Sequence, residues 1–171
     1  MTESLESARQ ELVGIIIQAF GVEQWGAIRN EKACNSSTPP FANKVDRGRT
    51  HFSENDPRVA EAFDDMDPAA KLFWLPDYLL NSLAEPFYQR HLVDFLLLEL
   101  GEPSARVFGL DDLQQIRAIE KYCDYLISTI LDLPSELRPF TEVSIATLSS
   151  LKSKCLLHFR RAGANGTTTD E

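Results

Sequence analysis

The fold is decided by the stretch Leu92-Val93-Asp94-Phe95-Leu96-Leu97-Leu98-Glu99-Leu100, which Gly101 follows directly. Leucine dominates this stretch and Val93 is its only β-branched residue, so it favours a helix over a buried strand. A helix that is apolar on nearly every side belongs in the interior of a bundle. We therefore predict that the central helix starts at Glu85-Pro86, ends at Leu100 and is surrounded by other helices.

Three further segments show the periodicity of amphipathic helices. The first is Ser4 to Phe20, which Gly21 stops. The second begins at a capping box in Asp111 to Gln114 and ends at Leu133-Pro134, and the third covers Thr141 to Arg161. The predicted core positions on these helices are Leu5, Ala8, Leu12, Ile15, Ile16, Ala19, Leu113, Ile116, Ile119, Cys123, Leu126, Ile130, Leu148, Leu151, Cys155, Leu156 and Phe159.

The middle of the chain carries weaker signals. Periodicity is absent over residues 30–55, which predicts a long irregular loop. Asp56-Pro57 and Asp67-Pro68 each place an acidic cap before a proline, so a short helix is expected after each pair. Pro76 must kink or restart the second of these helices, because it removes a backbone hydrogen bond.

No segment alternates with a period of two for long enough to require a sheet. The predicted fold class is therefore all-α: a single-domain helical bundle of about five to six helices. We place the domain at residues 1–161, with the long loop at 30–55, and expect a disordered tail at 162–171, where Gly, Asn and Thr dominate.

Composition excludes several classes of function. The chain has 171 residues, a formal net charge of −9 and a pI near 4.8, which disfavours nucleic acid and anionic membranes as partners. The N-terminus has acidic residues where a secretory signal has basic ones, and no apolar run is long enough to cross a membrane. We therefore expect a cytoplasmic protein with neither a nucleic-acid nor a membrane partner.

Three cysteines, Cys34, Cys123 and Cys155, are far apart and lack the spacing of metal ligands. Cys123 and Cys155 lie on apolar stripes and are expected to pack as small hydrophobic residues. Cys34 falls in the long loop, where a surface cysteine is a better interpretation than a nucleophile, because no histidine is near it in the sequence. The chain also lacks a Gly-rich phosphate loop, so no cofactor is predicted.

The acidic cluster Glu61, Asp64, Asp65 and Asp67 is the candidate for a metal site. Glu61 and Asp65 are one helical turn apart and share a face, as ligands of a hard cation must. The surrounding sequence has none of the features of a calcium-binding loop. A solvated helix face is therefore the preferred interpretation, and no metal is predicted.

His91 and Asp94 are the weak candidates for catalysis, because a carboxylate three residues away can orient a histidine as a general base. No signature of a nucleophile lies nearby. A surface ion pair between Arg90 and Asp94, with a histidine beside it, is the ordinary alternative.

Aromatic residues gather around Pro76, and three of them, Trp74, Tyr78 and Tyr88, are candidate binding residues. Aromatic side chains beside a broken helix can line a pocket for an apolar small molecule or anchor an interface. Core packing is the more common role of such residues.

The run Phe73-Trp74-Leu75-Pro76-Asp77-Tyr78-Leu79-Leu80, with the Val93 to Leu97 helix and the segment Leu110 to Ile119, resembles a family of small uncharacterised bacterial helical proteins. That family has an aromatic pair before a Leu-Pro-x-Tyr-Leu-Leu core, and the similarity covers roughly residues 57–127. The resemblance is one of packing, so it implies a helical fold and no site residues.

We expect a non-enzymatic module that binds another protein or itself. The reasons are the missing catalytic constellations, the long polar loop, and the contrast between the acidic segment 54–77 and the basic end of the chain (Lys152, Lys154, Arg160 and Arg161). One alternative is a small hydrolase or metal-dependent enzyme using Glu61, Asp65, His91 and Asp94. The other is the apolar small-molecule pocket around Trp74, Tyr78 and Tyr88.

Overall fold

The structure is a computed structural model that describes residues 3–21, 75–80, 82–83, 89–101, 110 and 112–165. Over these residues the regular structure is helical and no strand occurs, which confirms the all-α prediction. The elements are α1 (Glu3–Phe20), α5 (Gln89–Glu99), α6 (Leu113–Asp132), the short 3-10 helix η5 (Arg138–Phe140) and α7 (Ile145–Asn165). Residues 75–80 and 82–83 also have helical backbone.

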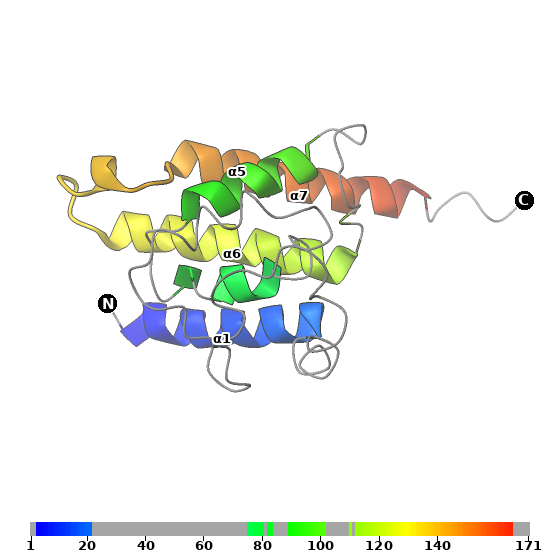
Figure 1. The fold of residues 1–171 in the computed structure, drawn as a ribbon, viewed down its shortest axis with the longest axis horizontal. Helices are drawn as coiled ribbons and strands as arrows, with labels where there is room; N and C mark the ends of the chain where they lie inside the picture. The colour runs from blue at the N-terminus through cyan, green and yellow to red at the C-terminus, as the bar shows by residue number, and fades with distance from the viewer. Residues whose placement is uncertain are drawn as a thin grey trace, which may run out of the picture.

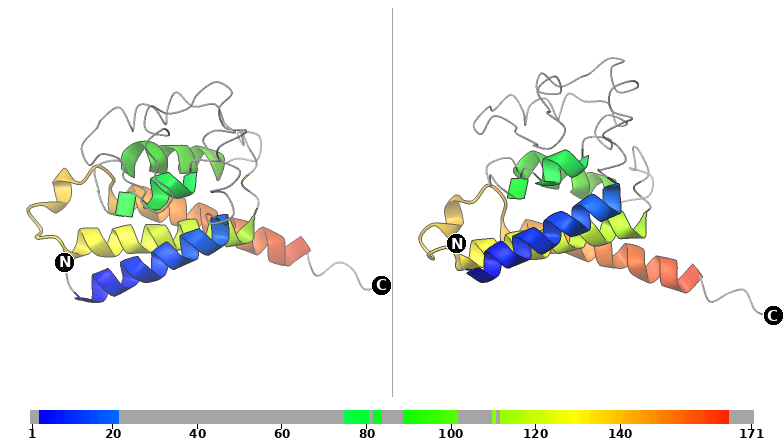
Figure 2. Two further views of the ribbon diagram at one scale, coloured as in Figure 1. Left: turned by 60° about the horizontal axis from the view of Figure 1, so that its bottom comes forward. Right: turned by 90° about the horizontal axis from the view of Figure 1, so that it is seen from below.

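Helices α1, α6 and α7 lie side by side in one layer, with α6 in the middle (Figure 1). Successive helices of the layer run in opposite directions. Helix α5 and the helical residues 75–80 and 82–83 lie against one face of this layer, α5 over α7 (Figure 2). The hydrophobic core fills the space between the layer and this cover.

Helix α1 forms and ends as its sequence predicts. Leu12, Ile16 and Phe20 follow one another at four-residue steps and are buried in the core. Gly21 ends the helix with φ of 59°, in the left-handed region that side chains other than glycine rarely adopt. The predicted stop at Gly21 is therefore confirmed.

Helix α6 is capped by Asp112, whose Oδ1 accepts hydrogen bonds from the backbone N–H of Gln114 at 2.7 Å and of Gln115 at 3.2 Å. The cap lies one residue after the first aspartate of the predicted capping box, and Leu133 closes the helix at the predicted end. The predicted seam is buried from Ile116 to Ile130, but Leu113, at the first helical position, is 43% exposed.

Helix α7 begins four residues later than predicted, at Ile145. The reason is local: the Ser144 hydroxyl accepts a hydrogen bond from the N–H of Thr147 at 3.1 Å, which makes Ser144 the cap. Leu148, Leu151 and Cys155 are buried as expected. Leu156 is exposed, so its assignment to the core was wrong, and α7 continues past Arg161 to Asn165.

The prediction that Leu92–Leu100 is the central helix was wrong. Leu92, Val93 and Leu96 are buried, but Leu98 is 56% exposed, and α5 packs on the layer from outside. The central position belongs to α6, which has α1 on one flank and α7 on the other. Helix α6 has 20 residues and α5 has 11, so α6 presents enough length to contact both neighbours along the whole layer.

Several predictions fall outside the described residues. These are the loop at 30–55, the two short helices expected after Asp56-Pro57 and Asp67-Pro68, the start of a helix at Glu85-Pro86 and the end of the tail at 166–171.

Candidate functional site

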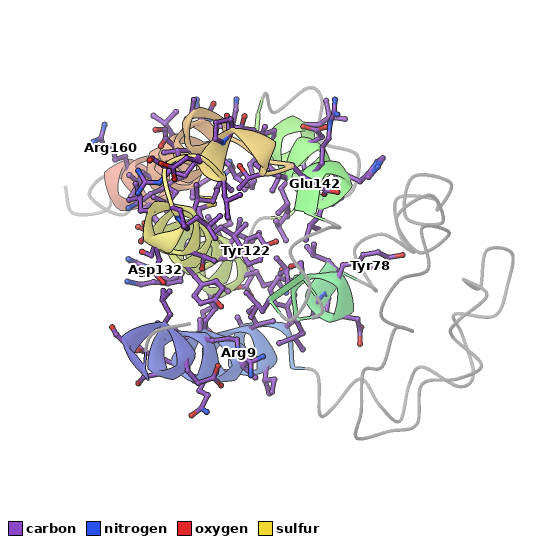
Figure 3. All side chains as sticks on the ribbon, turned by 90° about the vertical axis from the view of Figure 1, so that its left-hand side faces the viewer. Arg9, Tyr78, Tyr122, Asp132, Glu142 and Arg160 are labelled. Atoms are coloured by element: carbon purple, nitrogen blue, oxygen red, sulfur yellow. The ribbon has the colours of Figure 1, made fainter. Side chains whose placement is uncertain are left out.

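The layer formed by α1, α6 and α7 has one face that no described element covers. Figure 3 looks along these helices and shows α5 and residues 75–80 and 82–83 on one side of the layer only. Two open hollows of about 270 and 360 Å³ lie between α1 and α6 and adjoin at Ile15, which lines both. We call them together the α1–α6 groove. It is lined by Ser4, Leu5, Ala8, Glu11, Leu12, Ile15, Gln18 and Ala19 of α1, by Leu113, Gln114, Arg117, Lys121, Asp124, Tyr125 and Ser128 of α6, and by Phe159 of α7.

The groove lies on the side of α6 opposite to the core. Tyr122 of α6 lies towards the cover, where its hydroxyl bonds to Ser82 (Figure 3). At 100° per residue, Arg117, Asp124 and Ser128 lie about 120–160° around the helix from Tyr122. The groove is therefore a surface of the bundle, with apolar side chains of α1 and α6 at its base.

Two charged side chains of the groove wall are held within the molecule. Arg117 Nη1 lies 3.2 Å from Glu120 Oε2, and the Arg117 guanidinium stacks 4.5 Å from the centre of the Phe159 ring. Lys152 Nζ donates to Asp124 Oδ1 at 2.5 Å, and this hydrogen bond raises the pKa of Lys152. The Arg117–Phe159 and Lys152–Asp124 contacts join α6 to α7, and the Arg117–Glu120 contact lies within α6.

Two other charged side chains of the groove are exposed and unengaged. Glu11 on α1 and Lys121 on α6 line the same hollow from opposite walls. Neither side chain has an ion pair or hydrogen bond within the part of the chain that the structure describes. The groove thus offers one negative and one positive group to a ligand.

The polar groups on the covered side of the layer are satisfied internally. Ser82 Oγ and Tyr122 Oη lie 2.7 Å apart, and Ser82 Oγ donates to the Leu79 carbonyl at 2.8 Å. Burial raises the pKa of the Tyr122 hydroxyl well above its ordinary value. Glu99, buried at 1% exposure, accepts a hydrogen bond from the Leu110 N–H at 3.1 Å. The Ser82–Tyr122 contact joins the cover to the layer, and the Glu99–Leu110 contact joins α5 to the residue two positions before the Asp112 cap of α6.

The candidate catalytic residues His91 and Asp94 lie on the exposed side of α5. Asp94 Oδ2 is 3.8 Å from Arg90 Nε, so the predicted surface ion pair is present. Of the other predicted site residues, Tyr78 is buried at 4% exposure in the core. Trp74, Tyr88, Glu61 and Asp65 lie outside the described residues, so neither the predicted pocket nor the acid and histidine cluster is tested.

Cys123 and Cys155 are both buried, as the sequence predicts, and neither is in a disulfide. Burial raises the pKa of the Cys155 thiol to about 12 and that of Cys123 further. Thiols in this state are poor nucleophiles. Over the residues that the structure describes, no three His, Cys, Asp or Glu side chains gather in a way that would hold a metal ion.

The groove residues were not predicted as a site. Seven of its residues were predicted as core positions, and for the exposed Ala8 and Leu113 this prediction was wrong, whereas Glu11 and Lys121 were not singled out. One sequence signal was available: Ile15, Ile16 and Ile17 are consecutive, and three adjacent apolar residues cover more of a helix surface than one neighbour can bury.

The fold and this face define an all-helical protein: a three-helix layer that is covered on one side and grooved on the other. Comparisons with protein-family models, with curated proteins and with solved structures found no match to this chain. The resemblance of residues 57–127 to a bacterial family stays a prediction. Among the described helices, none combines the length and the apolar character needed to cross a membrane.

Proposed function

We propose that this protein is a non-enzymatic interaction module that binds another protein through the α1–α6 groove. The observation that carries the proposal is the groove itself, an open surface lined by Ile15, Ala8 and Leu113 next to unengaged charges. An exposed apolar groove with a polar rim is typical of a protein-binding surface.

The shape of the groove favours a macromolecular partner over a small molecule. Its two hollows are open to solvent and follow the helices, whereas sites for small ligands bury most of the ligand surface. The net charge of −9 supports a protein partner rather than a nucleic acid or an anionic membrane. The cytoplasm is the location that we propose for this interaction.

Site-specific cross-linking in cells of the source organism tests the proposal. A photoreactive amino acid is placed at Gln18, an exposed residue of the groove, and in a second variant at Asp94, an exposed residue of α5. We expect a discrete cross-linked protein adduct from position 18 and none of the same mass from position 94.

Matched leucine variants provide the control for this experiment. Leu113 lines the groove and is 43% exposed, and Leu98 on α5 is 56% exposed. Leu113→Gln is expected to reduce the adduct from position 18 about ten-fold, because it removes apolar contact from the interface. Leu98→Gln is expected to leave the adduct unchanged. Equal effects of the two substitutions, or no adduct from position 18, would contradict the proposal.

A further inference from the structure

We infer that the partner segment bound by the α1–α6 groove is an amphipathic α-helix with an acidic edge that pairs with Lys121 and a basic edge that pairs with Glu11. This inference rests on the proposed function and adds the structure and the charge pattern of the ligand. Three observations support it: the spacing of the lining residues, the length of the groove and the two unengaged charges.

The spacing of the lining residues matches what a third helix requires. The lining residues of α1 include a stripe at positions 4, 8, 11, 15 and 18, with 5, 12 and 19 beside it, and those of α6 include a stripe at 114, 117, 121, 124 and 128, with 113 and 125 beside it. Steps that alternate between three and four residues give a period of 3.5, so each stripe runs nearly straight along its helix. Two straight stripes on antiparallel neighbours form a trough into which the side chains of a third helix can pack.

The two walls of the groove also have equal length. Each stripe covers 14 residue steps, which at 1.5 Å per residue is about 21 Å. A helix of about four turns would occupy the whole groove. An extended peptide would leave its backbone N–H and C=O groups without partners here, because both walls are helices and offer no strand edge to pair with.

The charges on the two walls of the groove restrict which partner helices can bind. Glu11 on one wall and Lys121 on the other are exposed and have no partner among the described residues, in contrast to Arg117 and Asp124. A helix seated between the walls would place one of its edges against each charge. One edge must therefore carry a basic residue and the other an acidic residue, since like charges across an interface are unfavourable.

A second copy of this chain fits the groove less well. In a two-fold symmetric dimer through this face, the same surface patch would meet itself. A groove that faces an identical groove leaves both hollows unfilled. A projecting helix from a different protein fills the groove, and this is the occupant to which we commit.

The test uses three synthetic helical peptides of 16 residues with the same apolar seam, one with an acidic and a basic edge, one with two acidic edges and one with two basic edges. Binding of each peptide to the full-length protein is measured by fluorescence anisotropy. We expect the mixed-edge peptide to bind about five-fold more tightly than either of the others, since each of the others forms one exposed ion pair instead of two and places a like charge against the second wall. Circular dichroism of each peptide checks that all three have the same helix content.

Charge reversal in the protein sharpens the test. Glu11→Lys makes both walls basic and is expected to shift the preference to the doubly acidic peptide, whereas Lys121→Glu is expected to shift it to the doubly basic peptide. Both residues are exposed, so the thermal midpoints of the variants should match that of the wild type. Unchanged preferences in these variants would overturn the inference.

The outcomes separate this inference from the proposed function. Equal binding of all three peptides would show that the groove accepts helices without charge selection, which overturns the inference and leaves the proposed function standing. The same holds if no peptide binds while Leu113→Gln still abolishes the cross-link from position 18. A dimer in sedimentation velocity that Leu113→Gln dissociates would identify a second copy as the occupant and overturn the inference as well.

Discussion

Ser82 and Tyr122 are the pair of side chains that ties the cover to the layer. Ser82 Oγ donates to the Leu79 carbonyl, so the Tyr122 hydroxyl is the donor in the 2.7 Å contact between the two hydroxyl groups. Tyr122 is 0% exposed, and Ser82 is its hydrogen-bond partner in the described structure. Removing the partner of a buried donor lowers the stability of the folded protein by more than an average hydrogen bond contributes. The reason is that the unpaired donor cannot reach water.

Ser82→Ala and Tyr122→Phe are therefore predicted to have unequal effects. Ser82→Ala leaves the Tyr122 hydroxyl buried without an acceptor and should lower the free energy of unfolding by about 2–3 kcal/mol. Tyr122→Phe removes the donor itself and should cost about 1 kcal/mol. Urea denaturation of both variants and of the double variant measures these values. A larger loss in Tyr122→Phe than in Ser82→Ala would contradict this account of the contact.

The buried thiols make the free energy of unfolding depend on pH in the alkaline range. The pKa of Cys155 rises from 9.0 to about 12 on folding, so the folded state retains protons that the unfolded state releases. The stabilising contribution is complete below pH 9 and is lost as the pH rises from about 9 towards 12. We expect the free energy of unfolding to fall between pH 8.5 and about 10, and to fall less steeply in Cys155→Ala. Identical slopes in the two proteins would contradict the prediction.

Helix α5 is buried on one face and exposed on the other, although its sequence is a nearly continuous apolar run. Its buried residues Leu92, Val93 and Leu96 form one face, while Arg90 and Asp94 keep the opposite face in water. The helix ends at Glu99, and at Gly101, two residues later, a Cβ would lie 2.9 Å from the Leu97 carbonyl oxygen and 3.2 Å from that of Leu98. The absence of a side chain at Gly101 thus allows the close approach that ends α5.

Two glycine-to-alanine substitutions are predicted to act in opposite directions. Gly101→Ala places a methyl group against backbone oxygens, which cannot move aside as a flexible side chain would, and should cost about 1–3 kcal/mol. Gly14→Ala lies within α1, with nothing within 4 Å of the added Cβ, and should stabilise by about 0.5–1 kcal/mol through helix propensity. Thermal unfolding of both variants measures the sign. A higher thermal midpoint for Gly101→Ala would contradict the close approach of this Cβ position to the Leu97 and Leu98 carbonyl oxygens.

At the scale of the whole molecule, α6 is the helix on which the other elements assemble. It packs between α1 and α7, and Tyr122 links it to the cover. Backbone amides at the centre of a cooperative unit exchange with solvent only on global unfolding, while amides of peripheral elements exchange through smaller openings.

The rates of amide hydrogen exchange are therefore predicted to differ between the helices. Amides from Ile116 to Ile130 in α6 should exchange most slowly, and those of α5 should exchange at least ten-fold faster, because α5 packs on the layer from one side only. Mass spectrometry or NMR gives the rates. Equal protection of α5 and α6 from exchange would contradict the peripheral position of α5.

The candidate site was largely invisible in the sequence, for a physical reason. Glu11 and Lys121 are 110 positions apart and each looks like an ordinary solvated residue on its own helix. They become a pair only because α1 and α6 pack antiparallel and place them on facing walls of one hollow. Leu113 was predicted in the core and is exposed. The prediction failed because periodicity shows which apolar residues share a helix face but not whether a neighbour covers them.

The sequence by itself determined the helices and most of their ends. Gly21, Asp112 and Leu133 act within a few residues of their own positions, so local hydrogen bonding and backbone preference suffice to specify them. The tertiary structure alone decided which helix is central and which apolar residues remain at the surface. These are outcomes of competition among several apolar faces for contact, and the energy of such contacts depends on the other helices rather than on any one segment.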